Sequence, residues 1–171
     1  MTDTAHNLTA EQAARVVRRY QRRGDQWALA PGGAAGGAGR TTFFSGGAGL
    51  KSTARDYLLF DTMLLNKGTI HGRRVLKPES VALMSSNLVG DLYRGLGGNE
   101  GGSGFGVLVR VVQDASKVPG RTKGSLNWGG AYGTMSWTDP ENELVAVLMI
   151  QQSVDAVQTD FEVAVEKALT A

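Results

Sequence analysis

The chain has 171 residues, with 24 glycines, no cysteine, and 18 basic against 16 acidic side chains. This length favours one domain, and the absence of cysteine excludes disulfides, thiolate nucleophiles and cysteine-ligated metal sites. The net charge of +2 argues against nucleic acid as the main partner, no apolar run approaches the roughly 20 residues of a membrane helix, and the polar first residues show no signal peptide.

Residues 1–40 predict a helix followed by a glycine-rich linker. Thr9 and Gln12 have the spacing of a capping box, and apolar residues at helical spacing over 13–20 predict a helix that ends near Gly24. The other face of this helix would be basic, as a solvated surface or an anion-binding one (Arg15, Arg18, Arg19, Arg22 and Arg23). Residues 31–39 have the composition of a flexible linker.

Residues 41–104 predict a helical segment. Thr53 is a candidate cap, with Asp56 near the positive end of the helix dipole. An apolar stripe then runs to residues 66–68, where glycine allows the helix to stop. A small hairpin of 69–70 with 75–76, turning at Gly72, and a helix over 79–85, opened by Pro78, follow. The glycine-rich residues 95–106 also resemble a linker.

Residues 105–171 predict strands at 105–113, 126–128, 133–138 and 144–151, then a helix from Ser153. The turn at 139–142 is short enough to join antiparallel neighbours. The last strand is apolar on consecutive residues, so both of its faces should be covered. The fold class predicted for residues 1–171, taken as a single unit, is therefore α+β, an antiparallel sheet flanked by helices.

Two chemistries find little support in the sequence. Residues 46–53 resemble a phosphate-binding loop, but Leu50 stands where glycine must precede Lys51, so a turn into a capped helix explains them better. His6 and His71 are far apart and lie in no metal-binding motif, so we expect no metal and no other cofactor.

Nucleophilic serine chemistry is also unsupported. No serine is followed by lysine in an S-x-x-K pattern, and no tyrosine begins Y-x-N. Ser103 lies between glycines, but Phe105 occupies the last glycine position of G-x-S-x-G. The chain thus contains no activated nucleophile of a known kind.

The segment at 128–131, Trp-Gly-Gly-Ala, is the most informative for chemistry. Two glycines at a strand edge let a ligand approach the backbone, and successive amides can face a developing oxyanion. A strand bulge beside a core tryptophan explains the same residues equally well.

Taken in order, several segments resemble the serine β-lactamase-related family, which includes class C β-lactamases, family VIII carboxylesterases and penicillin-binding-protein-like enzymes. They are FSGGAGL at 44–50, STARDY at 52–57, MLLNKG at 63–68, LKPESV at 76–81, GFG at 104–106, WGGAYGT at 128–134 and WTDP at 137–140. The resemblance covers most of the chain, is closest to the esterase branch, and corresponds to the C-terminal portion of that fold.

The resemblance implies roles for five residues. Trp128, Gly129 and Gly130 would take the place of the family's third motif, usually K-T-G and in esterases often W-G-G or H-G-G. The amide of Ala131 would form half of an oxyanion hole, and Tyr132 would lie beside the substrate channel. Tryptophan in place of lysine offers no cation for a β-lactam carboxylate. The family's S-x-x-K and Y-x-N precede the matched portion, so the chain should be inactive alone.

Three hypotheses result. The first is the C-terminal part of a cytoplasmic serine hydrolase, which takes a small-molecule ester or amide substrate once an N-terminal half completes it. The second is a non-catalytic binding or assembly module, completed by a partner half or by self-association. The third and weakest is a phosphate or nucleic-acid binder that uses the arginines of residues 15–23. We otherwise expect neither nucleic acid nor a membrane as a partner.

Overall fold

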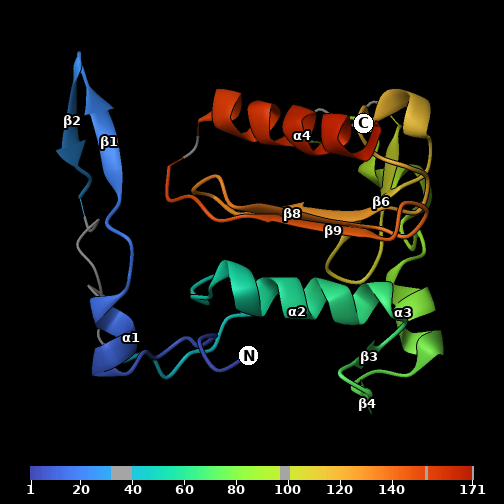
Figure 1. Cartoon of the computed structure of the whole chain (residues 1–171), viewed down its shortest axis with the longest axis horizontal. Helices are drawn as coiled ribbons and strands as arrows, with labels where there is room; N and C mark the ends of the chain where they lie inside the picture. The colour runs from blue at the N-terminus through green and yellow to red at the C-terminus, as the bar shows by residue number, and fades with distance from the viewer. Residues whose placement is uncertain (32–39, 97–100, 153, 171) are drawn as a thin grey trace.

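A five-stranded antiparallel sheet lies between two helices in the computed structural model, which describes residues 1–31, 40–96, 101–152 and 154–170 (Figure 1). The strands neighbour one another in chain order: β5 (Ser103–Phe105), β6 (Arg110–Val112), β7 (Leu126–Gly129), β8 (Met135–Asp139) and β9 (Leu144–Leu148). Helix α2 (Ala54–Leu65) covers one face and α4 (Asp155–Thr170) the other. The predicted α+β class with flanking helices is confirmed.

Helix α2 begins and ends where the sequence predicts. The Thr53 hydroxyl accepts a hydrogen bond from the Asp56 amide at 3.2 Å, which satisfies one of the free donors of the first turn. At the other end, the Gly68 amide donates to the Met63 carbonyl at 2.8 Å, with φ of 92°. The buried side of α2 contributes Met63 and Leu64 to the main apolar core, which α3 and the sheet complete (Val81, Val111 and Leu126).

The opposite face of the sheet packs on α4 through Trp137 of β8. This indole is 2% exposed, and the Phe161 ring of α4 meets it edge-on at 5.6 Å between centroids. The Arg121 guanidinium lies 3.7 Å from the Trp137 ring centroid on the same side. Strand β9 therefore has a helix on each side, and its continuous apolar run is explained as predicted.

Short elements connect these layers. Strands β3 (Thr69–Ile70) and β4 (Arg73–Arg74) pair around Gly72, so the second strand of the predicted hairpin comes slightly earlier than expected. Pro78 opens α3 (Pro78–Met84), as predicted. Two 3-10 turns, η1 (Gly90–Tyr93) and η3 (Ala115–Lys117), also lie in these connections.

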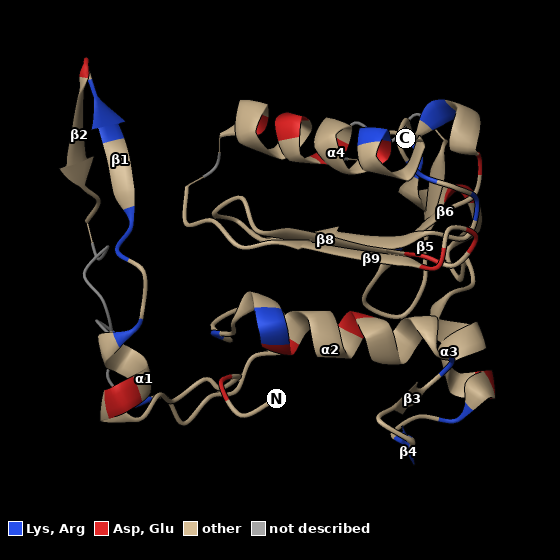
Figure 2. Ribbon diagram, viewed as in Figure 1, with Lys and Arg blue, Asp and Glu red and all other residues tan. Residues whose placement is uncertain are grey.

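The long first helix was predicted wrongly. Helix α1 spans only Ala10–Ala14, and the chain then forms a hairpin of β1 (Tyr20–Arg23) and β2 (Gln26–Leu29) with Gly24 in its turn. One helical turn adds little to the stability of the fold when nothing packs against it, so pairing between β1 and β2 is favoured over a longer helix. No basic helix face exists in this N-terminal arm (residues 1–29), and Figure 2 shows its positive residues after α1, in the connection and in β1.

The linker predicted at residues 95–106 and the strand predicted at 105–113 also need correction. The described part from Gly102 onward is buried, and a Cβ on Gly104 would lie 2.2 Å from Asn87 Cγ. These glycines allow close packing and do not provide flexibility. Residues 106–109 then turn, with φ of 65° at Leu108, and divide the strand into β5 and β6. Residues 32–39 of the first linker, residues 97–100, and Ser153 lie outside the described residues.

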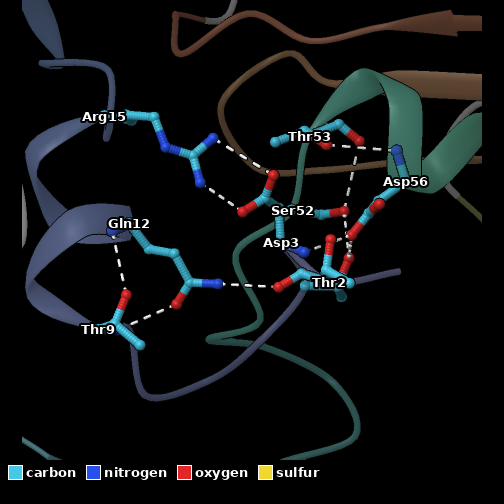
Figure 3. A network of polar contacts seen from close by, with 9 residues as sticks. Thr2, Asp3, Thr9, Gln12, Arg15, Ser52, Thr53 and Asp56 are labelled. Carbon is cyan, nitrogen blue, oxygen red and sulfur yellow. Dashed lines mark hydrogen bonds and ion pairs between the residues drawn. The ribbon is translucent and has the colours of Figure 1, made fainter.

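The N-terminal residues are tied to the start of α2 (Figure 3). The buried Asp56 carboxylate accepts hydrogen bonds from the Asp3 amide at 2.8 Å and the Thr4 hydroxyl at 2.9 Å. Arg15 forms an ion pair with Asp3, which attaches the end of α1 to the same point. Lys51 donates its ammonium to the His6 carbonyl at 3.1 Å, so this lysine holds the protein backbone and the structure agrees with the turn interpretation of residues 46–53.

Candidate functional site

Strand β7 loses its neighbour on one side before it ends. Its ladder with β6 stops at the pair of Asn127 with Arg110, but its ladder with β8 continues to Gly129. The chain before β6 turns away, because the Val107 amide donates to the Met84 carbonyl at 3.2 Å. The last two residues of β7 therefore form an open edge of the sheet.

The open edge leads into a tight turn at residues 130–133. The Gly130 amide donates to the Thr134 carbonyl at 2.8 Å, and the Gly133 amide donates to the Gly130 carbonyl at 3.0 Å. Neither Ala131 nor Tyr132 has a positive φ, whereas Gly133 has φ of 88°. This is a type I turn closed by a left-handed glycine, a common hairpin connection.

The turn fixes where two backbone groups point. In a trans peptide unit the N–H points opposite to the C=O. Because the Gly130 carbonyl faces into the turn, the Ala131 N–H points out of it, away from β8. Because the Gly130 amide faces β8, the Gly129 carbonyl also points to the open side. The open edge thus presents one outward donor and one outward acceptor.

Steric crowding explains, to different degrees, why glycine occupies three positions of this segment. A Cβ on Gly130 would lie 2.2 Å from the Thr134 hydroxyl, and one on Gly133 would lie 2.7 Å from the Gln152 carbonyl. A Cβ on Gly129 would approach the Thr134 carbonyl at 3.3 Å, a tight but less severe contact. The alternative of a core tryptophan at this strand is wrong, since Trp128 is 46% exposed and the core indole belongs to Trp137.

Aromatic side chains border the open edge on both sides. The Phe105 ring meets Trp128 at 5.1 Å and Tyr93 at 5.4 Å between centroids. On the other side Tyr132, also 46% exposed, lies under the Arg19 guanidinium at 4.3 Å. The structure therefore brings the five predicted residues, Trp128 to Tyr132, to one exposed strand end and adds neighbours that the sequence did not indicate.

A buried polar group lies beneath this strand end. Ser136 pairs directly with Trp128, and its side chain interacts with Asp61 and Tyr57 of α2. Burial raises the pKa of Asp61 to about 6, against a smaller opposing effect of the Ser136 hydrogen bond. Burial and the nearby Asp61 also raise the pKa of Tyr57. Sequence reasoning missed this network, for which the only signal was one acidic residue within the apolar stretch of α2.

Ser103, Ser125 and Ser136 are buried in the sheet region and do not lie on the open edge. Among the described residues, no group of three or more His, Asp or Glu is placed to hold a metal ion. Within the same residues, every helix is too short or too polar to cross a membrane.

The Beta-lactamase family model matches residues 1–169. The chain belongs to this family. Two proteins of Mycobacterium tuberculosis, Protein Rv1367c (strain ATCC 25618 / H37Rv) and Uncharacterized protein MT1414 (strain CDC 1551 / Oshkosh), are each 42% identical to it over 123 residues, which is 67% of this chain and 30% of theirs.

Two solved structures share the fold. EstCE1, described as a hydrolase with promiscuous acyltransferase activity, superposes with a TM-score of 0.77 at 22% identity, over 98% of this chain and 46% of that one. The LovD6 mutant of simvastatin synthase from Aspergillus terreus gives 0.76 at 20% identity, over 99% and 48%. The chain therefore spans less than half the length of these relatives, and the predicted family and partial-domain fold are confirmed.

Proposed function

We propose that this chain forms the oxyanion-binding part of a serine acyl-ester hydrolase whose nucleophile lies outside the 171 residues. One observation carries the proposal: the Ala131 N–H points outward from an open strand end, in a chain of the Beta-lactamase family. A fixed backbone donor of this kind stabilises the negative charge that develops on a carbonyl oxygen during acyl transfer. The exposed Gly129 carbonyl accepts a hydrogen bond from the substrate beside it.

The reaction divides between the two parts of the protein. A serine oxygen supplied by the S-x-x-K segment attacks the ester carbon, and the carbonyl electron pair moves onto the oxygen held by Ala131. Collapse of this intermediate expels the alcohol, which takes up the proton that the serine lost. Water then repeats the attack on the acyl-enzyme and releases the acid. With an alcohol in place of water, the same site would transfer the acyl group.

The side chains favour esters over β-lactams. Trp128 supplies an apolar surface at the position where the family usually has lysine, so the strand offers no ammonium to a β-lactam carboxylate. Trp128 and Phe105 instead form an aromatic wall along which an acyl group packs.

A fluorophosphonate probe and p-nitrophenyl butyrate test the proposal. The 171-residue chain alone should show no labelling and no turnover. A longer protein, in which a family segment with S-x-x-K and Y-x-N precedes the chain, should be labelled on the serine of that motif and should hydrolyse the ester. Stoichiometric labelling of any serine within the 171 residues would overturn the proposal, as would an inactive longer protein that is folded.

The second candidate function is a binding or assembly module. Exposed apolar side chains gather in the arm and the segment before α2, and Phe43 is 79% exposed (Val17, Trp27, Phe43, Phe44 and Leu50). Such a surface suits either a missing half or a second copy of the chain. Size-exclusion chromatography with light scattering decides whether the chain self-associates, and a monomer at high concentration contradicts self-association.

A further inference from the structure

Arg110 is a half-buried cation close to the open edge. It forms the final pair of the β6–β7 ladder with Asn127, the residue that immediately precedes Trp128. Its Nε and Nη2 atoms donate to the Tyr93 hydroxyl at 3.2 and 2.9 Å. In the part of the chain that the structure describes, no carboxylate lies within ion-pair distance of Arg110.

The guanidinium is continuous with the aromatic wall of the site. Tyr93, which orients Arg110, packs on Phe105, and Phe105 packs on Trp128. Extending the strand register by two residues from Asn127 places Gly129 roughly 7 Å further along the strand. A cation therefore lies at one end of an aromatic row, and the outward backbone groups lie at the other.

We propose that Arg110 selects acyl groups that carry a carboxylate at their far end. This inference rests on the proposed function and names its substrate class, a half-ester of a dicarboxylic acid. The ester carbonyl lies at Ala131, the body of the acyl group packs along Trp128 and Phe105, and the remote carboxylate pairs with Arg110. A guanidinium held on one side by a tyrosine keeps donors for a planar carboxylate on the other.

The aromatic row favours a ring as the body of the acyl group. A ring presents a flat surface to Trp128 and Phe105 and holds its two carbonyl groups at a fixed separation, which lowers the entropy lost on binding. Monomethyl terephthalate has this form, and dimethyl terephthalate is its neutral counterpart. The pair differs by one negative charge at the far end.

Binding of these two compounds to the 171-residue chain tests the inference without any turnover. Changes in the amide NMR signals of Gly129 and Ala131 report the site. We expect the half-ester to bind about tenfold more tightly than the diester. In Arg110→Gln the two compounds should bind equally, and Arg110→Lys should recover only part of the preference. Arg74→Gln, which removes an exposed arginine bound to backbone carbonyls elsewhere, should retain it.

The outcomes separate this inference from the proposed function. Equal binding of the two compounds to the unmodified chain overturns the role of Arg110, and this comparison needs no variant to fold. Loss of the preference in Arg74→Gln as well as in Arg110→Gln overturns it too, because the effect is then one of net charge. If the longer protein hydrolyses neutral esters while the chain shows no preference, the inference fails and the proposed function stands. If the preference is found but the longer protein is inactive, the proposed function fails.

Discussion

Asp61 should make the fold less stable at neutral pH than at acidic pH. The residue is 5% exposed, its carboxyl faces the sheet from the middle of α2, and one carboxyl oxygen, Oδ2, has no hydrogen-bond partner in the described structure. Its pKa rises from the ordinary 3.8 to about 6 on folding. The folded state therefore holds the proton more tightly than the unfolded state between these two values, and stability falls as the pH rises through this range.

The size of the effect follows from the two pKa values. A difference of one in pKa corresponds to about 1.4 kcal/mol, so ionised Asp61 costs the fold up to about 3 kcal/mol above pH 6. An asparagine side chain at this position would be neutral at every pH and of nearly the same shape. The substitution Asp61→Asn should thus stabilise the protein by about 1–3 kcal/mol at pH 8, after allowing for a weaker interaction with Ser136. Below pH 4 the change should be close to zero.

Urea unfolding followed by circular dichroism between pH 4 and 8 measures this. The difference in unfolding free energy between Asp61→Asn and the unmodified chain should grow with pH and level off above about 6. Asp160→Asn, on the exposed side of α4, is the matched control and should show no such growth. A constant difference for Asp61→Asn across this range would refute the reasoning that burial of this carboxyl opposes its ionisation.

Three further predictions concern stability. Gly133→Ala should lower the unfolding free energy by about 3 kcal/mol or more, because the residue has a left-handed φ and its Cβ would overlap other atoms. Gly124→Ala is the control, with a similar φ but open space, and should cost about 1 kcal/mol. Equal losses in thermal unfolding would contradict the steric argument. Glu162→Gln should cost about 1–2 kcal/mol, because the buried Arg121 guanidinium loses the negative charge of its ion-pair partner. Adding Arg121→Met should recover part of that loss, and additive losses in the double variant would count against this pairing. Asp56→Ala should release the N-terminal arm and speed tryptic cleavage at its arginines, while a cleavage rate equal to that of the unmodified chain would show that the arm is held elsewhere.

The sequence predicted the sheet and its two helices because their signals are strong and local. The cap at Thr53 and the left-handed glycine at Gly68 specify where α2 begins and ends. The apolar run of β9 reflects the helices that cover both of its faces. The first helix failed for the opposite reason. Apolar spacing behind Thr9 also fits a strand pair, and only pairing across residues 20–29 decides between the two.

The candidate site was predictable in position but not in detail. Trp128 to Tyr132 were selected from one short motif, and the structure places them on one exposed strand end. The outward direction of the Ala131 amide depends on the turn hydrogen bonds of Gly130, which no sequence pattern specifies. The neighbours Phe105, Arg110 and Asp61 come from other elements, so only the fold could bring them together.

Removing the Ala131 N–H is the most direct test of the proposal that the open edge binds the oxyanion. Ala131 occupies the second position of a type I turn, where proline fits the backbone but has no N–H. In the completed enzyme, Ala131→Pro should lower kcat by about a hundredfold to a thousandfold, whereas Ala131→Ser, which retains the amide, should stay near the unmodified rate. Equal rates for the two folded variants would contradict the assignment of this strand end as the site that stabilises the oxyanion.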